Sequence, residues 1–597
     1  MPAFQIPSKE KKFIQPNKSD TFGNLFSTFN LDFDSALGKV RVAPRVRINT
    51  DSGDDADLGL PLAFVRSSAG GTDQWWALTA GTGSTGALFK SSSNDPTGAF
   101  TQDALAGGDG TPTDMTRVSS DMVEFEGALI VSSPTDLHRL SASDWDKGWW
   151  DTTLAQTALT TGIAHPLHVT KKTNYLLIGD GNLLHTIDKN NNVRASRVIL
   201  PTEFEIICIR STYDGTWIGA RSKFNREAQA FFWDESAENY NRTYSLKSDM
   251  VFSCVIWNGI PYFVNGEGQL LGFNGSGFEE VAVFPNFEQI NKRLEDGSTV
   301  RRSIHRNGMD IIEGKIHILI NSSINNDFSK FLENFPFGIW TYDKDGGLRH
   351  KYAISQYDGT EIDYGSFVPS ATSALVATDS NLGLFLAGGI ITTNATTTLN
   401  AIFYRDINDS INKRGHFVTT IFESVAFEDI FKDLLATFKR FENSGDKIII
   451  KYRSIKDPAY PIKSITGTFT DTNTFTSTDS SLSAAVVGDE LFITRGRGAG
   501  TGVHISAIAF STPTYTIDLD EAITNASGTF RADIDNWTKC ATISTQGIDR
   551  QGFDLDVPGT FIKLKVELRS APAGTAANGS SPELERIVVN TTNEEVI

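Results

Sequence analysis

The stretch that decides the fold runs from Val251 to Pro285 and reads VFSCVIWNGIPYFVNGEGQLLGFNGSGFEEVAVFP. Apolar runs alternate in it with Asn-Gly and other glycine-rich segments, which predicts short strands joined by tight turns. Asn-Gly tolerates the positive φ that two-residue hairpin turns require. The predicted strands are Val251–Trp257, Ile260–Val264, Leu270–Phe273 and Val281–Phe284. Four antiparallel strands in about 35 residues make one small sheet, the size of a β-propeller blade.

Weaker copies of this unit recur between residues 51 and 412, the range predicted for a degenerate β-propeller. An apolar run, a polar or glycine turn and a second apolar run repeat about seven times, at intervals of roughly 40 to 65 residues. Because each sheet can bury its faces only against its neighbours, we expect a ring of about seven blades. A long array of β-sandwiches would give similar local signals. The other inner hairpins are predicted at Leu62–Val65 with Trp75–Leu78, Met122–Phe125 with Ala128–Val131, Leu167–Val169 with Tyr175–Ile178, Ile206–Ile209 with Thr216–Gly219, Ile311–Ile312 with Lys315–Ile320, and Ala374–Ala377 with Leu384–Ala387.

The chain after Asn412 predicts two further all-β units. Lys447–Arg453 (KIIIKYR) and Phe561–Leu568 (FIKLKVEL) are typical of core strands, whereas the Thr- and Ser-rich region between them contains only short strands. We expect a C-terminal β-sandwich of residues 413–463 and 536–597, with a small β-barrel of residues 464–535 inserted in it. Such an insertion at a loop tip is tolerated when the ends of the inserted domain lie close together.

Residues 1–50 predict an extended arm and a first strand. Lys39–Ile48 (KVRVAPRVRI) alternates aliphatic and basic residues, which is typical of a strand, and Ala43-Pro44 marks a bulge or an edge position. The arm carries isolated apolar residues that need a surface to lie on, either the chain's own body or a neighbouring subunit. The candidate subunit-contact residues are Phe13, Ile14, Phe22, Phe26 and Phe29.

The charge and the cysteine content argue against several classes of protein. The formal net charge is −18, from 72 acidic and 54 basic residues, which argues against a protein that reads nucleic acid. The three cysteines, Cys208, Cys254 and Cys540, are too scattered for a disulfide framework and are predicted to be buried thiols. The N-terminal stretch has no apolar signal region, and no run is long enough to cross a membrane, so we expect no membrane insertion.

Two segments invite a binding-loop interpretation. Gly496–Gly502 (GRGAGTG) is rich in glycine, but a strand rather than a helix is predicted after it, so a hairpin is favoured over a phosphate site. Asp51–Asp57 (DSGDDAD) is acidic, but it lacks the ligand spacing of an EF-hand calcium loop. We therefore expect no cofactor and no metal ligands.

Patterns for catalysis are equally weak. Ser211–Trp217 and Ser93–Phe100 come near the Asp-box of sialidase-type propellers, but the glycine spacing differs and ordinary turns are favoured. The histidines do not cluster, and His165 and His168 have no acidic or cysteine partner nearby in the sequence. The pairs Trp75-Trp76 and Trp149-Trp150 could stack on sugars, although packing between blades is favoured. We expect no catalytic residues and no enzyme.

The order of the predicted parts resembles the layout of one family. These parts are a short arm, a strand at KVRVAPRVRI, a degenerate propeller and a sandwich that ends in VPGTFIKLKVELRS (Val557–Ser570) and Ser581–Ile587. The arrangement is similar to the tail nozzle or hub proteins of tailed bacteriophages, which lie below the head–tail connector. The resemblance implies a non-enzymatic structural protein of the virion tail, made in the cytoplasm of the bacterial host. It also implies a ring of copies that contacts other tail and connector proteins, while genome DNA passes through during ejection without specific binding.

The sequence is also compatible with two other functions. One is a glycan-binding or sialidase-like propeller in host-surface recognition, which the tryptophan pairs and near Asp-boxes suggest. The other is an intracellular propeller scaffold, which is disfavoured because Trp-Asp and Gly-His signatures do not recur at fixed spacing.

Overall fold

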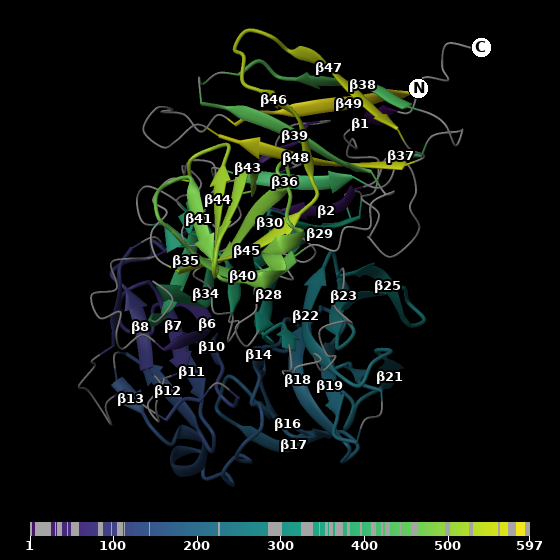
Figure 1. Ribbon diagram of the computed structural model, residues 1–597. Helices are drawn as coiled ribbons and strands as arrows, with labels where there is room; N and C mark the ends of the chain where they lie inside the picture. Colours follow the sequence, from purple (N-terminus) through teal and green to yellow (C-terminus); the bar gives the residue numbers. More distant parts are fainter. Residues whose placement is uncertain are drawn as a thin grey trace.

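The computed structural model is built almost entirely of β-strands (Figure 1). It describes residues 3–591 except 6–24, 30, 33–38, 44–45, 49–58, 81–86, 97, 104–110, 113, 117, 143, 225–226, 285–300, 324–337, 345–346, 353–355, 358–361, 364–373, 379–382, 394–396, 407–413, 420–421, 424–429, 442, 444, 455–461, 496–501, 524–528, 559–560 and 571–580. The predicted fold class is confirmed, since a propeller, a sandwich and an inserted closed barrel are all present.

The first three blades of the propeller are four-stranded antiparallel sheets in which the strands follow one another in chain order. Blade 1 holds β6 (Leu60–Ser67), β7 (Gln74–Ala80), β8 (Ala87–Ser91) and β9 (Phe100–Gln102). Blade 2 holds β10 (Met122–Phe125), β11 (Ala128–Ser132), β12 (Leu137–Ser141) and β13 (Asp144–Asp146), followed by a π-helical turn, η1 (Trp149–Thr153). Blade 3 holds β14 (Leu167–Val169), β15 (Leu176–Asp180), β16 (Leu183–Ile187) and β17 (Val193–Ile199).

Blades 4 and 5 repeat the pattern, and blade 5 is the stretch from which the fold was predicted. Blade 4 holds β18 (Phe204–Ser211), β19 (Thr216–Ser222), β20 (Gln229–Trp233) and β21 (Arg242–Ser245). Blade 5 holds β22 (Val251–Trp257), β23 (Ile260–Asn265), β24 (Gln269–Phe273) and β25 (Phe278–Val283). The prediction for the fourth strand began three residues too late, because Phe278 opens β25 by packing its ring edge-on against Phe263, with centroids 5.1 Å apart.

Blades 6 and 7 depart from the simple repeat. In blade 6 the inner position is shared by β26 (Arg301–Ser303) and β27 (Met309–Ile312), which both pair with the long β28 (Lys315–Ser323), followed by β29 (Gly338–Asp343) and β30 (Gly347–Tyr352). In blade 7, β33 (Leu375–Ala377), β34 (Gly383–Thr393) and β35 (Thr397–Asp406) are completed by β5 (Arg47–Ile48) from the N-terminal region. The closing strand therefore lies ahead of the 51–412 range predicted for the propeller.

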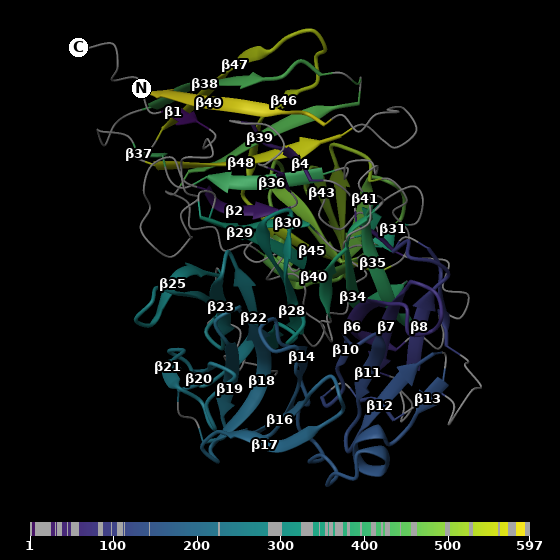
Figure 2. The same cartoon turned by 180° about the vertical axis from the view of Figure 1, so that it is seen from behind.

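Seven apolar clusters of buried residues close the ring, and each is shared by two neighbouring blades. Figures 1 and 2 show the strands of the blades below the strands of the sandwich. Consecutive tryptophans serve two seams, since Trp75 belongs to the cluster between blades 7 and 1 and Trp76 to the cluster between blades 1 and 2. Successive residues of a strand point to opposite faces of the sheet, and each face of a blade meets a different neighbour. Cys208 and Cys254 are buried together in the seam between blades 4 and 5, while Cys540 is only partly buried.

The sandwich stacks two sheets around one apolar core. One sheet has the order β1 (Ala3–Gln5), β49 (Leu584–Thr591), β38 (Ile430–Phe438) and β47 (Arg550–Pro558). The other has the order β2 (Leu25–Phe29), β36 (Arg414–Thr419), β48 (Phe561–Arg569), β39 (Lys447–Ser454) and β46 (Thr538–Ile543), with β37 (Phe422–Glu423) on β48.

The barrel enters the chain between two adjacent strands of the sandwich, β39 and β46. Its six strands close in the order β40 (Ile462–Phe469), β41 (Thr474–Ser477), β44 (Thr514–Leu519), β43 (Gly502–Ser511), β42 (Glu490–Arg495) and β45 (Thr529–Asp535), and a 3₁₀ turn, η3 (Ser480–Ala484), lies between β41 and β42. Because β39 and β46 are neighbours, the ends of the barrel lie close together, as an inserted domain requires.

The N-terminal region connects the sandwich to the propeller. Strands β1 and β2 belong to the two sandwich sheets, β3 (Leu31–Asp32) pairs with β4 (Arg41–Val42), and β5 belongs to blade 7. The prediction of a single strand at Lys39–Ile48 was wrong. The two halves, Arg41–Val42 and Arg47–Ile48, pair with different partners, and the sequence between them includes Pro44, which has no backbone donor. Val40 and Val42 are buried in the sandwich core, whereas Val46 is buried between blades 6 and 7.

Candidate functional site

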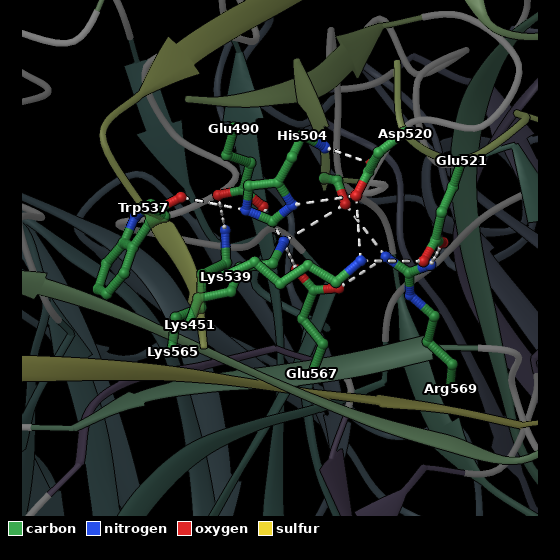
Figure 3. A network of polar contacts seen from close by, with 11 residues as sticks. Lys451, Glu490, His504, Asp520, Glu521, Trp537, Lys539, Lys565, Glu567 and Arg569 are labelled. Carbon is green, nitrogen blue, oxygen red and sulfur yellow. Dashed lines mark hydrogen bonds and ion pairs between the residues drawn. The ribbon is translucent and has the colours of Figure 1, made fainter. Parts of the chain in front are cut away.

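The largest group of buried charges lies where the barrel meets the sandwich (Figure 3). The sandwich contributes side chains from the adjacent strands β39, β48 and β46, and the barrel contributes β42, β43 and the residues that follow β44. We call this set the interface charge network: Lys451, Glu490, His504, Asp520, Glu521, Lys539, Lys565, Glu567 and Arg569.

Glu490 is the residue that the barrel inserts between two lysines of the sandwich. Lys451 and Lys565 lie directly opposite each other on β39 and β48, a like-charge pairing that destabilises a sheet by itself. The Glu490 carboxylate accepts from both, with Oε1 at 2.5 Å from Lys451 Nζ and Oε2 at 3.0 Å from Lys565 Nζ. The side chains of Glu490 and Lys565 are completely buried, so the barrel supplies a buried counter-charge to both lysines, and Lys451 has a second one from the sandwich itself.

Glu567 and Arg569 extend the network along β48. Glu567 Oε1 lies 2.6 Å from Lys451 Nζ, and Glu567 Oε2 lies 2.9 Å from Arg569 Nη2. Arg569 Nη1 donates to Glu521 Oε2 of the barrel at 2.8 Å, and Arg569 Nη2 donates to the carbonyl of Gly502 at 3.1 Å. Lys451, Arg569 and Lys565 outweigh desolvation and hold the pKa of the Glu567 carboxyl well below its usual range.

His504 lies at the rim of the network, next to Asp520. Lys539 Nζ lies 3.0 Å from Asp520 Oδ2 and 3.5 Å from Glu521 Oε1. His504 directs Nε2 to the carbonyl of Trp537 at 3.1 Å and lies 4.0 Å from Asp520 through Nδ1. Burial lowers the pKa of His504, and the nearby Lys451 adds to that shift, so the ring is neutral at pH 7.

The network is electrically balanced and closely packed. With His504 neutral, four cations (Lys451, Lys539, Lys565 and Arg569) face four carboxylates (Glu490, Asp520, Glu521 and Glu567). A Cβ at Gly502 would come within 1.7 Å of Glu490 Oε1, so only glycine leaves room for this carboxylate. The geometry suits one chemical task, which is to fix how the barrel sits on the sheet, because buried ion pairs contribute to specific geometry more than to stability.

A second polar cluster occupies the centre of the propeller. Arg306 and Asn307 lie between β26 and β27, and Asp121 precedes β10. Asp121 Oδ1 accepts from Asn307 Nδ2 at 2.7 Å, and Asp121 Oδ2 accepts from the N–H of Leu167 at 3.0 Å. Arg306 donates to the carbonyls of Val118, at 2.8 Å, and Ser120.

This central cluster connects blades across the ring. Asn307 Nδ2 reaches the carbonyl of Leu62 in blade 1 at 3.2 Å, and its own carbonyl accepts from Leu375 in blade 7 at 2.8 Å. Ser253 in blade 5 donates to the carbonyl of Arg306 at 2.6 Å. Arg306 and Asp121 are 7% and 3% exposed, so these polar contacts between blades are buried.

The residues singled out from the sequence are scattered. Phe26 and Phe29 lie in β2, which pairs with β36 of the chain's own sandwich, whereas Phe13, Ile14 and Phe22 lie outside the described residues. Contact of this arm with another subunit stays a prediction. Asp51–Asp57 and most of Gly496–Gly502 also lie outside the described residues, although Gly502 opens β43.

The glycan-site candidates are turns and core residues in the structure. Trp75, Trp76, Trp149 and Trp150 are all buried, as predicted for packing between blades. Asp214-Gly215 forms the turn between β18 and β19, where the N–H of Asp214 is bound by Thr212 Oγ1 at 3.2 Å.

Within the described part of the chain, no group of three or more His, Cys, Asp or Glu residues could hold a metal ion. In that same part, no helix is long and apolar enough to cross a membrane.

Comparisons with known proteins give no family. No family model matches the chain, and no curated protein matches it. Solved structures with similar folds include the extracellular domain of a one-component system of B. thetaiotaomicron (TM-score 0.36, 13% identity, 73% of this chain and 46% of that one), so the chain spans less than half the length of that protein. Others are a β-propeller domain from Myceliophteria thermophila (TM-score 0.35, 9% identity, 57% and 96%) and a chain of the Mitotic Checkpoint Complex (TM-score 0.33, 14% identity, 63% and 97%). Similarities this weak carry no argument about function.

Proposed function

We propose that this protein is a structural component of a bacteriophage tail, a nozzle or hub subunit that assembles into a ring around the DNA channel below the head–tail connector. The observation that carries the proposal is the way the modules are joined. One N-terminal region supplies strands to the sandwich and to blade 7, and the barrel is fixed to the sandwich by a neutralised buried charge network. A part that transmits load between neighbouring subunits needs such fixed geometry between its modules.

The polar clusters of the described residues support a structural task. Asp121, Arg306 and Asn307 use their side chains on backbone groups and on each other, and the network carboxylates are paired with lysine or arginine. Catalytic groups are usually found in clefts with perturbed and partly open environments, whereas Asp121, Arg306, Glu490 and Glu567 are buried. The proposal therefore includes no reaction and no cofactor.

The DNA path in this proposal lies between subunits and not along a propeller axis, because contacts of Arg306 and Asn307 join blades 1, 5 and 7 across the ring. The net charge of −18 fits a wall along which DNA slides. Phosphates bind to clustered Lys and Arg side chains, so an acidic wall does not retain the genome during ejection.

The decisive experiment is mass spectrometry of purified phage particles, combined with electron microscopy of their tails. The expected result is the full chain in the particles at a fixed ratio to the connector protein, and density for a propeller, a sandwich and a barrel repeated around the tail axis. Absence of the chain from the particles would refute the proposal.

A further inference from the structure

Strands β43 and β44 form a hairpin, and within the described residues the outer part of β43 has a strand partner on one side only, which is β44. β43 pairs with β42 only through Gly502, Val503 and His504, and Ile505 exchanges backbone hydrogen bonds with Gly488 and Asp489. From Ser506 to Ser511 the described structure pairs this strand only with β44. The register shifts between Ile505 and Ala507, and such a bulge bends a strand out of its sheet.

The free side of this segment is a strand edge of about 20 Å, at roughly 3.3 Å a residue. In an antiparallel pair, every second residue directs its N–H and C=O away from its partner. Half of the backbone groups of Ser506–Ser511 therefore point to the unpaired side, and Ser506, Ala507, Ala509, Phe510 and Ser511 are exposed. This is a template on which another strand can add.

Apart from the bulge at its start, the edge carries neither charge nor proline, which are common protections against strand addition. Soluble proteins place lysine, other charges or proline on exposed edges. From Ile505 to Ile517 the sequence ISAIAFSTPTYTI has no charged residue, and its proline lies in the turn and not on the edge. An uncharged edge of this kind is open to pairing with another strand.

Exposed apolar side chains gather at the same place. Phe510 is 57% exposed, and its ring lies tilted by 39° against the ring of Tyr515 with centroids 4.5 Å apart. Val486 and Val487, 60% and 62% exposed, precede Gly488, whose N–H donates to the carbonyl of Ile505 where the free edge begins. Large exposed apolar residues next to a strand edge mark an interaction surface.

We propose that the β43 edge binds an edge strand of a second copy of this chain. This inference rests on the proposed function, because a ring needs a contact between unlike surfaces of neighbouring copies. The charge distribution selects the occupant. Two copies that each carry −18 repel each other, and an uncharged edge lets them meet without burying like charges. The interface charge network fixes the direction of the hairpin, since His504 and Gly502 of β43 belong to it or contact it.

The test is the mass of the full chain in solution over a range of concentrations, measured by light scattering. The wild type is expected to associate as its concentration rises. Phe510→Lys should raise the concentration needed for association at least about tenfold, which corresponds to about 1.4 kcal/mol, because it replaces an apolar anchor with a charge that the contact would bury. Phe510→Trp keeps the apolar anchor and should associate like the wild type.

The matched control is Phe224→Lys, which makes the same substitution at an aromatic residue that is 69% exposed on blade 4. It should leave association unchanged, and thermal unfolding of every variant checks that it is folded. Association of Phe510→Lys at wild-type concentrations, or a wild type that stays monomeric throughout, would overturn the inference. Neither result touches the proposed function, which fails only if the chain is absent from the particles.

Discussion

At the scale of single residues, Lys451 is a buried charge whose removal should lower the free energy of unfolding. It is 1% exposed in its side chain and contacts both Glu490 and Glu567, so removing it leaves two enclosed carboxylates short of a cation. Lys451→Met should lower the free energy of unfolding by about 3–5 kcal/mol, the usual effect of breaking a buried pair by removing one partner. Urea unfolding followed through the combined fluorescence of the ten tryptophans measures this change.

The control for Lys451 is an ion pair at the surface of the sandwich. Lys439 lies 3.5 Å from Glu583 and is 45% exposed, so Lys439→Met should change the free energy of unfolding by less than about 1 kcal/mol. Equal effects of the two substitutions would contradict the claim that the buried network holds the barrel in place.

A substitution at Gly502 tests the same interface by a steric clash and leaves the number of charges unchanged. A methyl group at this position would displace the Glu490 carboxylate from its two lysines, because the contact would be 1.7 Å. Gly502→Ala should cost at least about 2 kcal/mol of unfolding free energy and speed up proteolysis of the barrel. Gly277→Ala is the comparison, since nothing lies within 4 Å of a Cβ there, and it should be close to neutral. A stable Gly502→Ala variant with a protected barrel would show that the carboxylate has another position.

The sequence predicts that the charged residues of β48 share one face of the strand, but it does not predict what that face contacts. In FIKLKVELR, residues Ile562, Leu564, Val566 and Leu568 face the sandwich core, so Lys565, Glu567 and Arg569 must lie on the opposite face. Alternation identifies that face but not what covers it. Only the folded chain shows that the barrel covers it, because Glu490 is supplied from a strand that begins 75 residues earlier than Lys565.

At the scale of elements, the seam between blades 3 and 4 depends on the protonation state of His168. Its Nε2 accepts from the N–H of Ser211 at 3.0 Å, which requires a neutral ring. Desolvation, with Arg210 and Lys171 nearby, lowers the pKa of His168 to about 3 from 6.5. Because the unfolded chain then binds the proton more readily, the stability that this histidine contributes is complete above about pH 6.5 and is lost as the pH falls towards 3.

His168→Gln isolates that effect, because the amide oxygen of glutamine can accept from Ser211 but does not titrate. We expect the thermal midpoint of the wild type to fall more steeply than that of the variant between pH 6.5 and pH 4.5, above the range in which most carboxylates titrate. Parallel curves for the two proteins would show that the folded histidine takes up a proton as readily as the unfolded one.

The blades themselves could be predicted well, for a local reason. The hairpins depend on turns such as Asn258-Gly259, where Asn258 has φ 51° and Gly259 has φ 78°, and these residues are visible in the sequence. The bounds that were missed depend on tertiary packing, as at Phe278 against Phe263. The inner position of blade 6 is also non-local, because β26 and β27 are separated by the segment that brings Arg306 and Asn307 to the centre of the ring.

At the scale of the whole molecule, the sequence could not indicate how the ring closes. β5 has two described residues, Arg47 and Ile48, and they pair with Tyr404 and Phe403 more than 350 positions away in the chain. Periodicity indicates that a strand is present near these residues, but it does not select a partner sheet. The connection matters because the same region holds Val40 and Val42 in the sandwich core and Val46 in the seam between blades 6 and 7.

Removing residues 1–50 tests this connection between propeller and sandwich. The truncation exposes the edge of β35, opens the seam filled by Val46 and takes Val40 and Val42 from the sandwich core, so both modules should lose protection from amide exchange. A shorter truncation, of residues 1–24, keeps β2 to β5 and removes β1. It should leave exchange in β35 unchanged while it exposes β49. If the longer truncation left β35 as protected as in the intact chain, β5 would not be the strand that closes the propeller.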